Sequence, residues 1–186
     1  MSDSTPRDPR PVSVLFVCLG NICRSTMSEG VFRSLTTSPS NPHPLISTID
    51  SCGTGAYHIG SSPDRRTMAT LKANGINDYT HSARRFKPAT DLEKFDYIFA
   101  MDRDNLEDLM RLRKQESKRL GLGEGGEGLG KVMLFGEFGG KGKGGSAEEV
   151  DDPYYGGDDG FEVAYEQAMR FSKAFLKKLE DGELSK

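Results

Sequence analysis

The feature that most constrains the fold is a run of seven residues, VSVLFVC at Val12–Cys18, which is almost entirely apolar and rich in β-branched side chains. A short run without polar alternation predicts a strand covered on both faces, as the strands of parallel sheets are. A loop with glycine and asparagine follows, and then Met27, Val31 and Leu35 recur at four-residue spacing, which predicts a helix. The chain therefore opens with a buried strand, a short loop and a helix.

The same alternation continues along the chain. Further strands are predicted at residues 45–50, 96–102 and 131–135, and further helices at residues 63–74, 105–113 and about 161–179. Gly75 is expected to end the helix at 63–74. Strands that alternate with helices predict an α/β domain with a parallel sheet. A chain of 186 residues, 35% of them hydrophobic, has the usual size for one domain.

Three segments fall outside this pattern. Residues 1–11 are rich in Pro, Ser and charge and are expected to form a disordered tail, so that a single domain covers residues 12–182. Residues 121–130 and 139–149 are too rich in glycine for regular structure and are expected to be mobile surface loops. Neither has the Gly-Lys-Ser/Thr ending of a nucleotide-binding loop.

Charge and composition limit the partners of the chain. A net charge of −3 and a pI near 5.7 argue against nucleic-acid binding, and the arginine-rich stretches at 65–66, 84–85 and 111–119 are expected to be solvated faces. The first residues do not resemble a signal peptide, and no segment approaches the roughly 20 apolar residues of a membrane span. We therefore expect a soluble cytoplasmic protein that binds no membrane. Three cysteines fit neither a disulfide framework nor a zinc site, so reduced thiols and no metal are expected.

Cys18 and Arg24 lie six positions apart across the junction between the first strand and the first helix. Backbone amides of such a loop can turn inward, and the helix adds the positive end of its dipole. Arg24 can hold two oxygens of an anion, while Gly20 and Asn21 tolerate the positive φ values that an inward-facing loop often needs. This junction is predicted to bind an oxyanion such as phosphate.

The same surroundings favour the thiolate form of Cys18 and predict a nucleophile. The alternative is an ordinary buried cysteine at the end of a strand. Ser25 is expected to serve as the N-cap of the helix and as a hydrogen-bond donor to the thiolate when it leaves.

Asp152, in the sequence VDDPYYGG, is the candidate general acid that protonates the leaving group. Pro153 stiffens the backbone beside it, the glycines that follow allow a loop to close over the site, and Tyr154 and Tyr155 offer flat walls for an aromatic substrate. The alternative is a surface turn with two partly buried tyrosines.

Residues 14–25, which read VLFVCLGNICRS, together with DPYYG at 152–156, resemble the low-molecular-weight protein tyrosine phosphatases. The likeness also covers residues 50–51, 57–60, 95–102 and the final helix. It implies a three-layer α/β/α fold with a four-stranded parallel sheet and the phosphate-binding loop between the first strand and the first helix. The implied reaction is hydrolysis of phosphotyrosine in proteins, and of small aryl phosphates, through a phosphocysteine on Cys18. In this reaction Asp152 acts first as the general acid on the tyrosine oxygen and then as the general base on water, and no metal or cofactor takes part.

The resemblance also assigns roles to further residues. The implied phosphate-binding residues are Leu19, Gly20, Asn21, Ile22, Cys23, Arg24 and Ser25. Asn21, Ser25, Ser51 and His81 match positions that hold this loop in shape, and Tyr57 and His58 face Tyr154 and Tyr155 across the substrate cleft. Cys23 matches a second cysteine that can pair with the nucleophile under oxidation.

Two other functions stay open. Arsenate reductases share this fold and loop, but they pass a disulfide along two further cysteines, and this chain has no cysteine from Gly53 to Lys186. A non-catalytic phosphotyrosine-binding module would use the same cradle without turnover, although it would normally lack Cys18 or Asp152.

Overall fold

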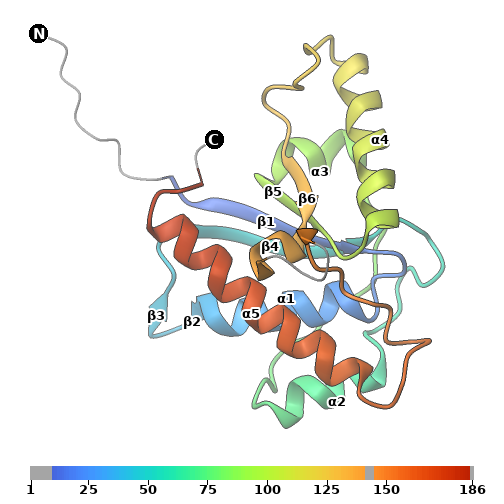
Figure 1. Cartoon of the computed structure of the whole chain (residues 1–186), viewed down its shortest axis with the longest axis vertical. Helices are drawn as coiled ribbons and strands as arrows, with labels where there is room; N and C mark the ends of the chain where they lie inside the picture. The colour runs from blue at the N-terminus through green and yellow to red at the C-terminus, as the bar shows by residue number, and fades with distance from the viewer. Residues whose placement is uncertain (1–9, 141–144, 185–186) are drawn as a thin grey trace, which may run out of the picture.

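The computed structural model describes residues 10–140 and 145–184, and a parallel sheet forms its centre. The sheet consists of β1 (Val12–Cys18), β4 (Ile46–Gly53), β5 (Tyr97–Ala100) and β6 (Lys131–Leu134). The strands are parallel and stand in the order β4-β1-β5-β6 (Figure 1). The predicted four-stranded parallel sheet is confirmed.

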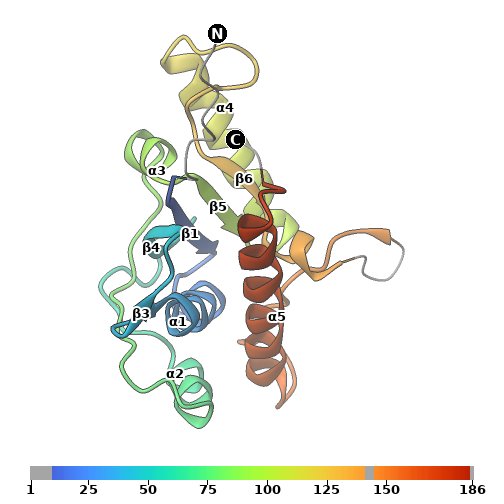
Figure 2. The ribbon, with the colours of Figure 1, turned by 90° about the vertical axis from the view of Figure 1, so that its left-hand side faces the viewer.

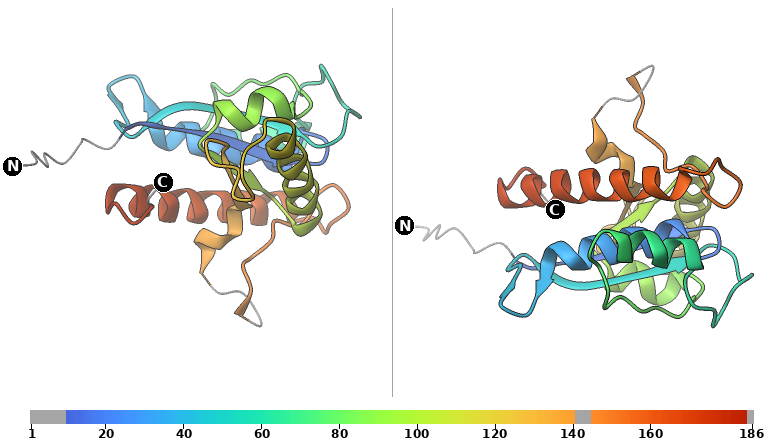
Figure 3. Two further views of the ribbon diagram at one scale, coloured as in Figure 1. Left: turned by 90° about the horizontal axis from the view of Figure 1, so that it is seen from above. Right: turned by 90° about the horizontal axis from the view of Figure 1, so that it is seen from below.

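Helices cover both faces of the sheet (Figures 1 and 2). Successive side chains of β1 point to opposite faces, and each face is apolar and forms a core with the helices that cover it. Val14 and Phe16 belong to the core with α1 (Arg24–Thr36) and α5 (Gly160–Glu180). Leu15 and Val17 belong to the core with α3 (Pro88–Lys94) and α4 (Arg103–Arg119). These two cores make the predicted three-layer arrangement, in which α5 runs alongside α1 (Figure 3).

Aromatic rings join the sheet to α5 and to the segment after β6. Phe99 of β5 lies with its ring centroid 5.1 Å from that of Phe135 and 5.1 Å from that of Phe175, and Phe16 lies 5.1 Å from Phe135. All four side chains are fully buried. Offset and edge-to-face pairs of this kind add to the burial of apolar area, so this cluster fixes α5 against the carboxyl half of the sheet.

Some elements differ from the sequence-based expectation. The helix expected at 105–113 is α4, which continues to Arg119 because residues 114–119 are good helix formers without an apolar stripe. Four short elements were not predicted: α3, the two-residue strands β2 (Thr37–Ser38) and β3 (Asn41–Pro42), and η1 (Phe135–Gly139). Elements this short carry too little periodicity to be recognised. The helix expected at 63–74 is α2 (Arg65–Ala73), and Gly75 follows it with φ of 82°.

The segments outside the predicted elements are described in part. Residues 121–130 contain turns but no helix or strand, and Leu129 within them is buried. Gly139, the first residue of the second glycine-rich segment, is the last residue of η1, and residues 145–149 belong to no named helix or strand. Most of the predicted tail (1–9) and part of the second glycine-rich segment (141–144) lie outside the described residues. Among the helices of 10–140 and 145–184, none is both long and apolar enough to cross a membrane.

The strand order places a topological switch point beside β1. The chain runs from β1 to β4 on one side and then crosses to β5 on the other. In open α/β sheets, ligands bind at such a point, outside the carboxyl ends of the strands. Cys18 is the last residue of β1 and therefore stands where the fold offers a crevice.

Candidate active site

The loop between β1 and α1 turns its carbonyl oxygens outward. The Cys18 and Leu19 carbonyls accept hydrogen bonds from the amides of Thr54 and Gly55, both at 2.9 Å, and the Ile22 carbonyl accepts one from Asp64 at 2.8 Å. In a planar trans peptide the N–H points opposite to the C=O. The amides that follow these carbonyls therefore point to the opposite side of the loop, where an anion can accept their hydrogen bonds.

The Cys18 sulfur receives hydrogen bonds from inside the same loop. The Asn21 amide donates to Sγ at 3.3 Å, and the Ser25 hydroxyl lies 3.1 Å away. Ser25 Oγ already accepts from Asn21 Nδ2 at 2.9 Å, so its own hydrogen is free to point to the sulfur. Both groups suit a thiolate. Ser25 is not the helix N-cap that the sequence suggested, because α1 begins one residue earlier with Cys23 at the cap position.

Asn21 holds the loop in its unusual conformation. Its φ of 57° makes it the one non-glycine residue with positive φ among those described. The side chain is 1% exposed, donates to Ser25 and Ser51 at 2.9 Å each, and accepts from His81 Nε2 at 2.8 Å and from the Arg84 amide at 3.0 Å. All the residues that the sequence placed behind the loop, Asn21, Ser25, Ser51 and His81, therefore meet in one network.

Glu29, which the sequence analysis did not identify, completes this network at 1% exposure. Its Oε2 accepts from the Ser51 hydroxyl at 2.6 Å and the Tyr79 hydroxyl at 2.7 Å, and its Oε1 accepts from Arg33 at 2.9 Å. These donors satisfy a carboxylate that would otherwise be costly to bury. Burial, followed by the charge of Glu29, raises the pKa of Tyr79, so the phenol stays a donor.

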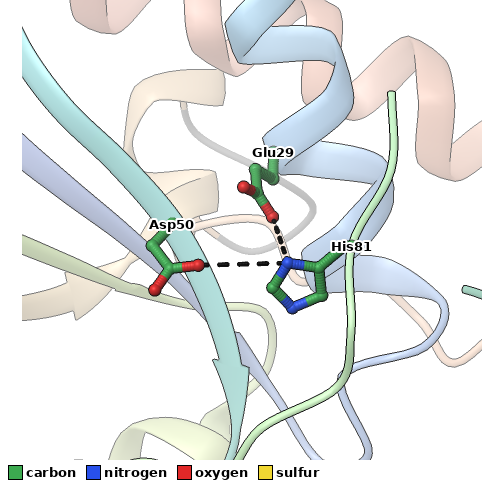
Figure 4. A group of neighbouring side chains, drawn as sticks. All are labelled: Glu29, Asp50 and His81. Carbon is green, nitrogen blue, oxygen red and sulfur yellow. Dashed lines mark ion pairs between the residues drawn. The ribbon is translucent and has the colours of Figure 1, made fainter. Parts of the chain in front are cut away.

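Glu29, Asp50 and His81 lie close enough to be considered as metal ligands, and Figure 4 shows His81 Nδ1 facing both carboxylates. Nδ1 is 3.4 Å from Glu29 Oε2 and 3.9 Å from Asp50 Oδ1. The oxygens of Asp50 already accept from the Ser51 amide and from Arg84 Nε. Because protein donors occupy these carboxylates, the group acts as a hydrogen-bond network that supports the loop.

Arg24 is buried, with 4% of its side chain exposed, and it connects three parts of the chain. Its Nη1 donates to Asp102 Oδ2 and, at 3.1 Å, to the Val150 carbonyl, while its Nη2 lies 3.5 Å from Asp152 Oδ2. Burial alone would lower the pKa of Arg24, but the charges of Cys18 and Asp102 outweigh burial and raise it. The guanidinium is therefore a permanent cation beside Cys18.

A cavity of about 460 Å³ lies over the loop. It brings together Cys18, Arg24 and Asp152 with both predicted walls; its lining residues are Cys18, Leu19, Gly20, Ile22, Cys23, Arg24, Tyr57, His58, Asp152, Tyr154 and Tyr155. Asn21, Ser25, Ser51 and His81 are not part of this lining and stand behind it. A nucleophile, a buried cation, inward amides and a carboxyl group in one cavity suit transfer of a phosphoryl group.

Besides Glu29, three contributors to this arrangement were missed in the sequence analysis. Asp102 was included only as the end of a predicted strand, yet it also caps α4 by accepting from the Asn105 amide at 2.8 Å. Gly53 lies where a Cβ atom would stand 2.6 Å from the Leu19 carbonyl oxygen, so glycine is required there. Arg84 was expected on a solvated face, which is wrong, because its guanidinium pairs with Asp50 and Asp91. Only Asp102 could have been recognised from the sequence, because an acidic residue that follows a buried strand often lies at the site.

Comparisons with known proteins agree with this geometry. The family model described as low molecular weight phosphotyrosine protein phosphatase matches residues 13–184. A Schizosaccharomyces pombe protein of that name is 48% identical over 168 residues, which cover 90% of this chain and 97% of that protein. A protein tyrosine phosphatase of Entamoeba histolytica, solved with Hepes in its active site, matches with a TM-score of 0.73 and 32% identity over 93% of this chain and 99% of that one. A Drosophila arginine phosphatase matches with a TM-score of 0.72 and 32% identity over 88% and 95% of the two chains.

Gly53→Ala is expected to weaken anion binding without unfolding the sheet. The added Cβ would press on the Leu19 carbonyl and, at 3.2 Å, on the Asn21 amide, so the loop must shift. Loss of one hydrogen bond to a charged ligand is worth roughly 1.5–3 kcal/mol, or about tenfold or more in Kd. Calorimetric titration with inorganic phosphate measures the change. Gly123→Ala is the control because nothing lies within 4 Å of its added Cβ; equal affinities in the two variants would contradict the prediction.

Proposed function

Because this chain belongs to the low molecular weight phosphotyrosine protein phosphatase family, whose members hydrolyse phosphate monoesters, we propose that Cys18, Arg24 and Asp152 carry out this reaction on phosphotyrosine in proteins. The observation that carries the proposal is the cavity in which these three residues meet between two aromatic walls. The roles of the individual residues follow from their surroundings.

In the first step, the Cys18 thiolate attacks phosphorus, a sulfur–phosphorus bond forms, and the bond to the tyrosine oxygen breaks. Asp152 gives its proton to that oxygen, so that a phenol leaves in place of a phenoxide. Arg24 Nη1 donates its hydrogen bonds to Asp102 and the Val150 carbonyl, so the edge formed by Nε and Nη2 remains to bind two phosphate oxygens. The inward amides of the loop stabilise the remaining charge.

In the second step, the Asp152 carboxylate takes a proton from water, the water oxygen attacks phosphorus, and the phosphorus–sulfur bond breaks. Inorganic phosphate leaves, and Asp152 is again protonated for the next cycle. The Ser25 hydroxyl, 3.1 Å from Sγ, stabilises the thiolate that departs. Ser25 therefore stabilises the Cys18 thiolate before the first step and again when it leaves in the second step. The donor role expected from the sequence is kept in the proposal.

The walls of the cavity suit an aromatic substrate. Tyr57 is 76% exposed and Tyr155 is 84% exposed, and each offers a flat ring at the rim of the cavity. The phosphotyrosine ring would fill the space between them, since aromatic side chains gain from stacked and edge-to-face contacts. Small aryl phosphates need only this inner space and are expected to react too, whereas a phosphoserine side chain is too short to gain from the rim.

The proposed reaction uses the side chains and backbone amides of this chain and requires neither a metal nor a cofactor. We place the protein in the cytoplasm, with phosphotyrosine proteins as its partners. The three free cysteines support this location, because Cys18, Cys23 and Cys52 are unpaired thiols of the kind that a reducing compartment maintains. Membrane and nucleic-acid partners form no part of the proposal.

The first test compares phosphate release from a phosphotyrosine peptide and a phosphoserine peptide, with chelator present, by the wild type and Cys18→Ser. We expect the wild type to release phosphate from the tyrosine peptide alone, and Cys18→Ser to release none. A phosphoarginine peptide belongs in the same assay, because one structural relative is an arginine phosphatase. Binding without turnover by both proteins would favour the binding module, and arsenate is the substrate to test if neither binds.

Asp152→Ala is expected to lower kcat/KM by about 100-fold or more for aryl phosphates whose leaving group has the pKa of tyrosine, because a positioned acid is worth about 10² to 10⁴ in rate. For nitrophenols, which leave without a proton, the loss should be much smaller. The measurement is the slope of log kcat/KM against leaving-group pKa. Equal losses of kcat/KM across the substrate series would rule out Asp152 as the general acid.

Cys23 is proposed to protect Cys18 under oxidation, and this protection should depend on pH. Peroxide oxidises the Cys18 thiolate to a sulfenic acid, and the Cys23 thiolate then displaces hydroxide to form a disulfide. Burial, followed by the charge of Asp64, raises the pKa of Cys23 to about 12, so below that pH the reactive thiolate fraction rises with pH. After a brief peroxide pulse, disulfide formation followed by mass spectrometry should accelerate about tenfold per pH unit.

The control for this experiment is Cys52→Ala, since Cys52 lies in β4 within the other apolar core. Disulfide formation should be unchanged in Cys52→Ala and absent in Cys23→Ala. Full recovery of activity by thiol without any Cys18–Cys23 bond would rule this protection out.

A further inference from the structure

We propose that Arg66 is a positioning residue for the reaction, because it connects the phosphate-binding loop to the segment that carries Asp152. The proposal rests on the role of Asp152 given above and adds a residue that neither the predicted site nor the lining of the cavity includes. Arg66 lies in the first turn of α2 and has contacts in two directions.

The first direction leads to the phosphate-binding loop through Asp64. The Asp64 amide donates to the Ile22 carbonyl at 2.8 Å, so the residue before α2 is fixed to the loop. Arg66 is held to Asp64 by a bidentate pair, with Nε 3.0 Å from Oδ1 and Nη2 2.9 Å from Oδ2, and its amide donates to the same carboxylate at 2.8 Å. The plane of the guanidinium is therefore fixed relative to the loop.

Asp64 also stays ionised in this arrangement. The hydrogen bond from Arg66 is the main cause that lowers the pKa of Asp64, and burial opposes it only in part. The lowered pKa favours the ionised carboxylate and therefore the pair with Arg66.

The second direction leads to the segment around Asp152. The guanidinium carbon of Arg66 lies 5.1 Å from the centre of the Tyr154 ring and 4.7 Å from the centre of the Phe161 ring. Both distances are within the range of cation–π attraction. Tyr154 and Phe161 stand near the two ends of the segment that joins Asp152 to α5, so Arg66 holds both ends at once.

Tyr154 transmits this position to Asp152. Its amide donates to Asp152 Oδ1 at 3.0 Å, and Pro153 between the two residues restricts the backbone. The backbone hydrogen bonds of residues 152–157, within the part of the chain described, go to neighbours in the same segment, as from Tyr155 to Asp152 and from Gly156 to Pro153 at 3.4 Å each. The contacts with Arg66 and the ion pair between Asp152 and Arg24 are therefore the charged side-chain contacts that connect this segment to the phosphate-binding loop.

Arg66→Ala should consequently misplace the acid while leaving the nucleophile and the phosphate-binding loop in order. We expect kcat/KM to fall about tenfold for aryl phosphates with a leaving-group pKa near 10, which is part of what a positioned acid contributes, and less than about twofold for nitrophenyl phosphates. The slope against leaving-group pKa should lie between those of the wild type and Asp152→Ala. A role limited to folding would not change this slope.

The matched control is Arg65→Ala, which removes the same side chain from the adjacent position. Arg65 is exposed like Arg66, but it takes no part in the contacts with Asp64, Tyr154 and Phe161, so its removal should leave the slope and kcat/KM unchanged. Thermal denaturation of each variant shows whether it is folded. If Arg66→Ala does not fold, Arg66→Lys serves in its place, because lysine keeps the charge but lacks the flat face that contacts the two rings.

A double-mutant cycle with Tyr154→Ala tests the path itself. If Arg66 acts through Tyr154, Arg66→Ala should have little further effect on the slope once the tyrosine ring is gone. Additive effects of the two substitutions would overturn the proposal, and so would a uniform loss across the substrate series in Arg66→Ala. If Asp152→Ala itself leaves the slope unchanged, the proposed function fails first and the Arg66 proposal fails with it. A normal result for Asp152→Ala with an unchanged slope for Arg66→Ala overturns the Arg66 proposal alone.

Discussion

The buried charge of Arg24 is the constraint on which the rest of the site depends. A guanidinium with 4% exposure is costly to desolvate and is tolerated only where acceptors surround it. Those acceptors come from Asp102, which follows β5 and caps α4, from the Val150 carbonyl and from Asp152. Satisfying one cation therefore brings together segments that lie 78 and 126 residues from Arg24 in the sequence. The same requirement brings the segment with Asp152 close to Arg24 and to the loop that begins at Cys18.

The phosphate-binding loop is the rigid part of this site. Its carbonyls bond outward to Thr54, Gly55 and Asp64, and the buried side chain of Asn21 has both donors and its acceptor occupied. A fully satisfied polar network gives one geometry, whereas a partly satisfied network would permit several. Glu29 extends this network into the core through Ser51, so the loop that we propose binds phosphate is supported by a charge outside the cavity.

The sequence predicted the parts of the site that are local in the chain. A strand, a loop and a helix follow from the apolar run and the four-residue spacing, and Cys18 and Arg24 take their meaning from that local context. Glu29, Asp102 and Gly53 could not be assigned in this way, because each acts on a segment that only the tertiary fold brings near. The same applies to Arg66 and Arg84, which look like surface arginines in the sequence and are engaged in the structure. Ser51 and His81 were identified only through the family resemblance, since nothing in their immediate neighbours marks them.

The contrast between the rigid loop and the segment around Asp152 fits the chemistry that we propose for each. In the proposed reaction Arg24 keeps its charge and can be buried, whereas Asp152 has to release a proton and regain it from water. Its side chain is accordingly 32% exposed, and the segment that carries it has backbone hydrogen bonds mainly to itself. An acid that needs access to water cannot be fixed by burial, and yet a general acid must stand within hydrogen-bond reach of the leaving oxygen. Contacts from outside the segment have to supply that precision, and Arg66 stands on the rigid side of the site with its guanidinium against both ends of the segment.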